Sequence, residues 1–130
     1  MTLENDPLAR KAHADLVVER AAGQLRQILH AAVAAIEPFP PYPGSFFNYA
    51  IEVEPGALAS RDRGCVVVGQ DGELYELIMK VDLTGDPADA VGMRDEELKP
   101  LDLSPAEYVI LAYEAIKAVV AYQLEQTEPG

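Results

Sequence analysis

The sequence is poor in side chains on which much protein chemistry depends, because its 130 residues include no tryptophan, one cysteine and two histidines. A lone cysteine, Cys65, cannot form an internal disulfide. It opens an apolar run, in which we expect a buried and inert thiol. His13 and His30 lie seventeen residues apart on one predicted helix, which separates them by about 25 Å at 1.5 Å per residue. They therefore cannot share a metal ion or a catalytic site, and we predict that both are solvated.

Basic side chains are also scarce. Ten lysines and arginines stand against 22 aspartates and glutamates, which leaves a formal charge of −12 at pH 7. This charge repels the phosphate backbone that supplies most nucleic-acid affinity, so we expect no DNA or RNA partner. Residues 71–130 carry −10 of the −12, because fourteen acids and four bases lie there. This acidic half is either a solvated surface that aids solubility or a docking surface for a basic protein partner.

Long apolar segments are missing as well. The longest unbroken runs, such as 31–36 and 108–113, fall far short of the roughly 20 residues that span a bilayer. The first ten residues lack the basic start and the apolar run of a signal peptide. Glycine-rich phosphate loops and the HExxH and GxSxG motifs are absent. We therefore expect no membrane association, no cofactor and a cytoplasmic location, and we favour a protein without enzymatic activity.

What the sequence does contain is typical of a single domain over residues 1–130. Asp6 is a predicted N-cap, and Pro7 is the first residue of a long helix that ends near Ile36. Residues 37–45 hold four prolines and are predicted to form a stiff connector. Their PxxP spacing is also found in ligands of proline-recognising domains. The apolar stripe of the predicted helix consists of Ala14, Val17, Val18, Ala21, Ala22, Leu25, Ile28, Leu29, Ala32, Val33 and Ile36.

Three strand signals follow the connector. Residues 47–53 and 75–83 alternate apolar and polar side chains, which is the period of a half-buried strand. Residues 65–68 form a short apolar run that is typical of a central strand. Between the last two strands, Asp71-Gly72 predicts a tight hairpin. Residues 84–103 are predicted to form a long acidic loop, in which 86–89 and 94–98 could each form one helical turn.

A capping box marks the start of the final helix. Ser104, Pro105 and Glu107 have the residue types and spacing of this motif, and they predict a helix from Pro105 to about Gln126. The order of elements is then helix, three strands, helix. We therefore predict an α+β fold with two layers (α-β-β-β-α), in which a long N-terminal helix and a C-terminal helix pack on a three-stranded antiparallel meander.

A meander brings two loops of opposite charge to the same end of the sheet. Arg61 and Arg63 lie between the first two strands, and Asp82, Asp86 and Asp89 follow the third. One interpretation is a set of exposed ion pairs, each worth about 0–1 kcal/mol. The other is a small-molecule or divalent-cation site, because Ca²⁺ and Mg²⁺ prefer oxygen ligands. The acidic residues lack the spacing of an EF-hand loop, so no metal site is predicted outright.

The final helix is apolar on nearly every side, and such a helix is usually buried on more than one of them. Either a second copy of the chain, or the first helix or the 84–103 loop, must cover the second side. We expect a second copy, because twofold dimers are the commonest assembly. The face predicted to pack on the sheet consists of Val109, Ala112, Tyr113, Ile116, Val119, Val120 and Leu124. The predicted dimer interface consists of Ile110, Leu111, Ala115, Ala118, Ala121 and Tyr122.

These observations favour a small acidic binding or assembly module without catalytic activity, which acts as a homodimer. The alternative function is a small-molecule-binding or cation-binding protein that uses Arg61, Arg63, Asp82, Asp86 and Asp89 at the loop end of the sheet.

Overall fold

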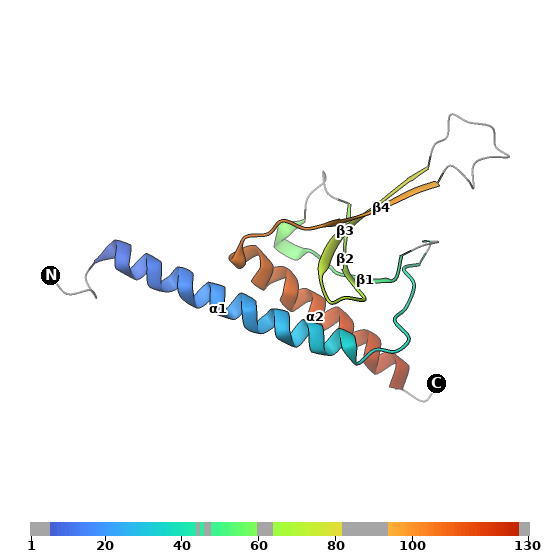
Figure 1. Ribbon diagram of the computed structural model, residues 1–130, viewed down its shortest axis with the longest axis horizontal. Coiled ribbons are helices and arrows are strands. Elements are labelled where there is room, and N and C mark those ends of the chain that lie inside the picture. The colour runs from blue at the N-terminus through green and yellow to red at the C-terminus, as the bar shows by residue number, and fades with distance from the viewer. Residues whose placement is uncertain (1–5, 44, 46–47, 60–63, 82–93, 128–130) are drawn as a thin grey trace.

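The computed structural model describes residues 6–43, 45, 48–59, 64–81 and 94–127. The elements in chain order are α1 (Pro7–Ala34), β1 (Ala50–Glu52), the 3-10 helix η2 (Gly56–Leu58), β2 (Cys65–Gly69), β3 (Leu74–Val81), β4 (Arg94–Pro100) and α2 (Pro105–Thr127). The sheet is antiparallel with the order β1-β2-β3-β4, and both helices lie on one side of it (Figure 1). The predicted α+β fold, with two helices on an antiparallel meander, is therefore confirmed.

The sheet has four strands where the sequence predicted three. Residues 94–98 were expected to form a helical turn within a loop, but they belong to β4, which pairs with β3 from Val81↔Arg94 to Tyr75↔Pro100. Five of the seven side chains in β4 are charged, and Leu98 is its one large apolar residue. The sequence of β4 does not alternate apolar and polar residues, so it lacks the pattern from which a strand is predicted. The strand forms because its backbone pairs with β3, although its residue types do not favour a strand.

The local signals at the ends of elements are confirmed. The Asp6 carboxylate accepts a hydrogen bond from Leu8 N at 3.0 Å and caps α1. At the start of α2, Ser104 N donates to Glu107 Oε1 at 3.0 Å and Glu107 N donates to Ser104 Oγ at 3.2 Å. The predicted hairpin joins β2 to β3, and Gly72 takes the positive φ of +83° that its tight turn requires.

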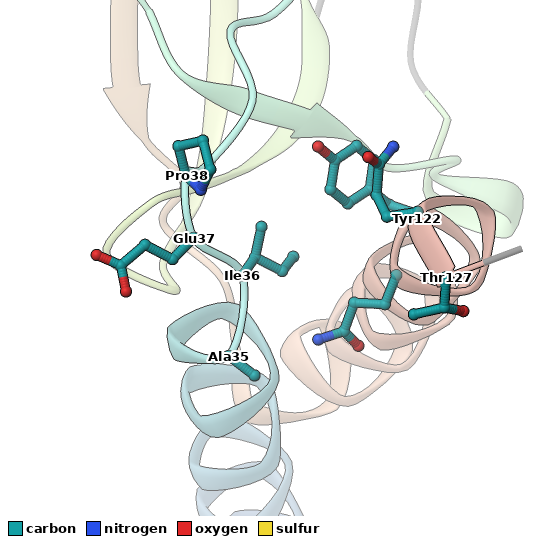
Figure 2. A pocket seen from close by; sticks show the side chains of 8 residues that line it. Ala35, Ile36, Glu37, Pro38, Tyr122 and Thr127 are labelled. Carbon is teal, nitrogen blue, oxygen red and sulfur yellow. The ribbon is translucent and has the colours of Figure 1, made fainter. Parts of the chain in front are cut away.

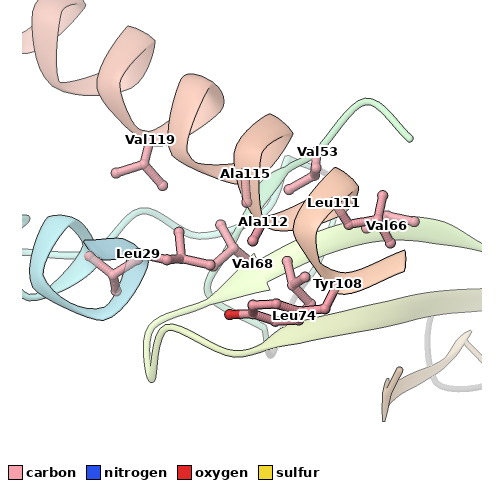
Figure 3. Packing of buried hydrophobic residues seen from close by; sticks show 11 residues of the cluster. Leu29, Val53, Val66, Val68, Leu74, Tyr108, Leu111, Ala112, Ala115 and Val119 are labelled. Carbon is pink, nitrogen blue, oxygen red and sulfur yellow. The ribbon is translucent and has the colours of Figure 1, made fainter. Parts of the chain in front are cut away.

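The main core lies between the helices and the sheet (Figure 3). α2 contributes Tyr108, Leu111, Ala112, Ala115 and Val119, α1 contributes Leu29 and Val33, and the strands and the residue after β1 contribute Val53, Val66, Val68 and Leu74. The predicted sheet-facing side of α2 is therefore correct only in part: Ala112 and Val119 are buried, whereas Tyr113, Val120 and Leu124 are exposed. On a helical wheel the buried face is turned by roughly 90° from the predicted one. A helix that is apolar on nearly all sides does not specify which side is buried.

The connector folds back over the other face of the sheet. Tyr42 N donates to Asn48 O at 2.9 Å, and the Tyr42 ring packs in a second buried cluster with Ala50, Val67 and Leu77. The Asn48 amide donates to Glu96 of β4 at 3.0 Å, so the connector region is joined to the far edge of the sheet. β1 begins only at Ala50, and it is therefore shorter than the strand predicted over 47–53.

α1 extends well past the other elements, and its first half projects beyond the start of α2 (Figure 1). Nearly every side chain over residues 7–20 is exposed, whereas the fully buried residues of α1, Leu29 and Val33, lie in its second half. Within the described part of the chain, neither α1 nor α2 combines the length and the apolar character needed to cross a bilayer.

Candidate functional site

The predicted loop-end site lies outside the described residues. Arg61, Arg63, Asp82, Asp86 and Asp89 all belong to segments that the structure does not describe, as does the first half of the predicted 84–103 loop. In the described ranges, no group of three or more histidine, cysteine, aspartate or glutamate side chains could hold a metal ion.

Cys65 is exposed at the start of β2, so the prediction of a buried thiol is wrong. Its register partner is Leu77, which places it on the face of the sheet that the connector covers. Burial, together with a hydrogen bond to Cys65, raises the pKa of Tyr42 above its ordinary value of 10.0. His30 contacts Gly72, at the opposite end of β2. The structure therefore places Cys65 beside a tyrosine and well away from this histidine.

His30 belongs to a cluster that joins α1, the β2–β3 hairpin and α2. Its Nε2 lies 2.9 Å from Glu73 Oε1, and Arg26 Nη1 lies 2.6 Å from Glu73 Oε2. The Arg26 guanidinium carbon also lies 4.5 Å from the centroid of the Tyr108 ring. The prediction of a solvated His30 is thus wrong in part, since the side chain is half-buried against the hairpin. We call Arg26, His30, Gly72, Glu73 and Tyr108 the hairpin clamp.

The hairpin clamp holds α1 against the β2–β3 turn. A Cβ atom at Gly72 would lie 2.8 Å from His30 Cδ2, so α1 packs directly on the backbone of the turn. The Tyr108 hydroxyl is buried without a hydrogen-bond partner in the described residues, and burial raises its pKa. The Tyr108 side chain lines none of four cavities formed by described residues. The cluster fixes the position of α1 on the β2–β3 turn.

Two cavities flank the C-terminal half of α2. The first, of about 350 Å³, lies between the end of α1 and the end of α2; there the Ile36 side chain points across the opening toward α2 and Glu37 points away (Figure 2). The second, of about 480 Å³, lies beside β1. Both volumes fall within the range of about 300–1,000 Å³ that is usual for ligand sites. Tyr122 lines both cavities.

We call the second cavity the edge groove. It is lined by Pro40, Pro41, Pro43, Ala50, Ile51, Glu52, Ala118, Ala121, Tyr122 and Glu125. These residues come from the connector, β1 and α2, which are distant in the sequence. No local sequence pattern joins these residues, so this site could not be predicted from the sequence.

The predicted dimer interface on α2 is divided among three environments. Leu111 and Ala115 are fully buried in the core of the single chain, so they contact the sheet and not the solvent. Ala118, Ala121 and Tyr122 line the edge groove. Ile110 is exposed. These residues do not form one exposed surface, because α2 is rotated about its axis relative to the predicted orientation.

A different apolar surface is exposed on the two helices. Val17 and Ile28 of α1 and Tyr113, Val120 and Leu124 of α2 are all exposed, and we call these five residues the outer helical face. On each helix they lie within about 40° of one another on a wheel at 100° per residue, and they point away from the buried residues. Both groups border the α1–α2 contact, where Gln123 Nε2 donates to Ala32 O at 3.3 Å. The two helices therefore expose apolar side chains on the side opposite the sheet, and Lys117 Nζ lies over the Tyr113 ring at 5.0 Å from its centroid.

Comparison with protein-family models, with curated proteins and with solved structures finds no match to this chain.

Proposed function

We propose that the protein is a binding and assembly module without catalytic activity, and that it acts as a homodimer through the outer helical face. The observation that carries this proposal is the exposure of five large apolar side chains on the side of the helices that the sheet does not cover. Exposed apolar patches of this kind commonly mark interfaces.

The first half of α1 supports the same conclusion. Residues 7–20 form four turns of helix that pack on almost nothing within the chain. Isolated helices shorter than about 12–15 residues are marginal in water, because most helix stability comes from packing of an apolar face. Val17 lies on the same side of α1 as the exposed Ile28, about 20° away on a helical wheel. A second copy that covers both residues would bury apolar surface along the projecting half.

Twofold packing of the outer helical faces would place four helices between two outer sheets. A closed dimer of this kind uses the same patch on both copies. It leaves the connector-covered face of each sheet in solvent. We place this assembly in the cytoplasm, in keeping with its single cysteine.

The absence of catalysis is part of the proposal. Cys65 is the one cysteine of the chain, and the hairpin clamp holds His30 at the far end of β2. A cysteine nucleophile requires a base within hydrogen-bond reach, and this separation favours binding over chemistry.

Light scattering at micromolar concentration tests the dimer with a matched pair of tyrosine variants. Tyr113→Glu places a charge on the outer helical face, where the parent side chain is 56% exposed, and Tyr49→Glu makes the same change at the residue before β1, where the side chain is 50% exposed. We expect a parent mass of twice 14.1 kDa, a folded monomer for Tyr113→Glu and a dimer for Tyr49→Glu. A monomeric parent, or two variants that remain equally dimeric, would contradict the proposal.

A further inference from the structure

Two residues of the strand β1, Ala50 and Glu52, direct their backbone polar groups away from the sheet. Ala50 N donates to Pro40 O at 3.1 Å, on the outer side of the strand, whereas Val53 N donates to Val66 O at 2.8 Å, toward β2. Successive residues of an antiparallel strand direct their N–H and C=O groups to opposite sides. Glu52 therefore directs its N–H and C=O away from the sheet, as Ala50 does. Within the described residues, no backbone group pairs with Glu52 on that side.

The edge groove lies where these groups emerge, and its walls are acidic and apolar. Glu52 of β1 and Glu125 of α2 both line the groove, and both are exposed. Side chains alternate along β1, so the Glu52 side chain lies on the connector-covered face with Ala50, whereas Glu125 lies on the helix side. Within the described part of the chain, neither carboxylate forms an ion pair with a lysine, an arginine or a histidine. Beside Glu125, Ala118, Ala121 and Tyr122 supply an apolar surface.

We propose that the edge groove binds an extended basic peptide segment of a partner protein, which adds to the sheet beside β1. The peptide backbone exchanges hydrogen bonds with the N–H and C=O of Glu52, as in other cases of strand addition. A lysine or arginine side chain of the peptide lies opposite Glu52 on the connector-covered face of the sheet. The neighbouring apolar side chain points to the other face and packs on Tyr122, and a further basic side chain of the peptide reaches the exposed Glu125. The net charge of −12 attracts such a segment over a long range.

A second copy of the chain fits this edge less well. Antiparallel pairing of two β1 strands about Glu52 would place two like charges directly opposite each other, which is destabilising. The connector blocks the edge at Ala50 through its hydrogen bond with Pro40. The free edge is thus short, and a large part of the affinity must come from the two carboxylates. Binding is therefore expected to weaken as the salt concentration rises.

Fluorescence polarisation with a labelled peptide of alternating lysine and valine tests this proposal. Replacing both groove carboxylates, in the variant Glu52→Gln/Glu125→Gln, is expected to weaken binding roughly tenfold or more, since each charge-assisted contact is lost. The control variant Glu19→Gln/Glu97→Gln removes the same charge from exposed positions outside the groove. We expect it to bind within about twofold of the parent, because distant surface charges are largely screened.

Two further peptides separate strand addition from general attraction to an acidic surface. A peptide N-methylated at alternate residues cannot donate to the Glu52 carbonyl, and a peptide of lysine and glycine has the same charge without the apolar side chains. Both are expected to bind more weakly than the parent peptide. Equal binding of all three peptides, equal losses in the two double variants, or no binding to the parent protein would each overturn the proposal.

The result does not depend on the dimer. Tyr113→Glu is expected to bind the peptide with unchanged affinity, and Glu52→Gln/Glu125→Gln is expected to keep the mass of the parent. A titration of the unmodified protein followed by NMR supplies a test that needs no variant. The amide signal of Glu52 should shift on addition of the peptide, and a peptide that binds without moving that signal would contradict strand addition at β1.

Discussion

Three of the six tyrosines hold their phenolic protons more tightly than a solvated tyrosine does. A hydrogen bond to Asp71, and then burial, raise the pKa of Tyr75 to about 12. Burial is the main cause of the raised pKa values of Tyr42 and Tyr108. A pKa raised by folding means that these residues stabilise the folded state fully below pH 10, and that this contribution is lost as the pH rises toward 12.

Tyr75→Phe removes one of these groups. At neutral pH we expect the variant to lose about 0.5–1.5 kcal/mol of unfolding free energy with its hydrogen bond. Between pH 10 and pH 12 it should lose less further stability than the parent, because Tyr75 no longer titrates there. Urea unfolding at a series of pH values measures both effects. A variant that shows the full alkaline loss of the parent would contradict the raised pKa of Tyr75.

Adjacent residues on α2 differ sharply in burial, which allows a direct test of how this helix is oriented. Leu111 is 0% exposed and Ile110 is 40% exposed. Leu111→Ala is expected to cost about 2–5 kcal/mol, as for a buried leucine that leaves a cavity. Ile110→Ala should change the free energy of unfolding by less than about 1 kcal/mol. Both are read from urea unfolding at one fixed protein concentration, and equal costs at the two positions would contradict the orientation of α2.

At the scale of elements, the sequence predicts helix caps and turns, which depend on neighbouring residues. It does not predict the strand β4 or the buried side of α2, which depend on contacts with distant segments. Asp6, Ser104 and Glu107 make their caps within a few residues of themselves, and Gly72 meets a requirement of its own turn. β4 is a strand because β3 lies beside it, and its own charged residues do not indicate one. The buried side of α2 is settled by the sheet and α1, because the apolar pattern of the helix favours no single side.

The edge groove escaped prediction for a related reason. Its wall residues are each ordinary in their own segments, and only the return of the connector beside β1 brings Pro40, Glu52 and Tyr122 together. The exposure of Cys65 could not be predicted, because an apolar run does not show which of its residues are buried once the strand is packed. Function in this fold thus depends on contacts between distant segments.

The β2–β3 turn is the point where α1 rests on the sheet, and glycine substitutions test that contact. Gly72→Ala adds a Cβ at a φ of +83° and within 2.8 Å of His30 Cδ2. We expect it to destabilise the fold by about 1–3 kcal/mol, from backbone strain and from displacement of His30. Gly23→Ala, at a helical glycine with nothing within 4 Å of the added atom, should instead stabilise by about 1 kcal/mol. Thermal melts of the two variants should therefore move in opposite directions, and a neutral Gly72→Ala would contradict the packing of α1 on the turn.

For the whole molecule, the projecting half of α1 links folding to association. If a second copy covers it, the amides over residues 8–20 gain protection from hydrogen exchange only when the protein is concentrated enough to dimerise. Dilution should therefore accelerate exchange over 8–20 while amides over 29–34, which belong to the core of the single chain, change little. Exchange that is identical at both concentrations would show that the projecting half is stable without a partner.

The two edges of the sheet also determine how far the protein can associate. Open sheet edges allow chains to add one after another into ribbons, unless charge or cover prevents it. Here β4 carries the exposed charges of Glu97 and Lys99, and β1 has three residues, of which Ala50 is already paired with the connector. Each chain can therefore accept one short added strand at β1. Within the described segments, it has no second open edge at which further chains could add to the sheet. Concentrated solutions should contain discrete particles of fixed stoichiometry, without the open-ended fibres that an uncovered sheet would seed.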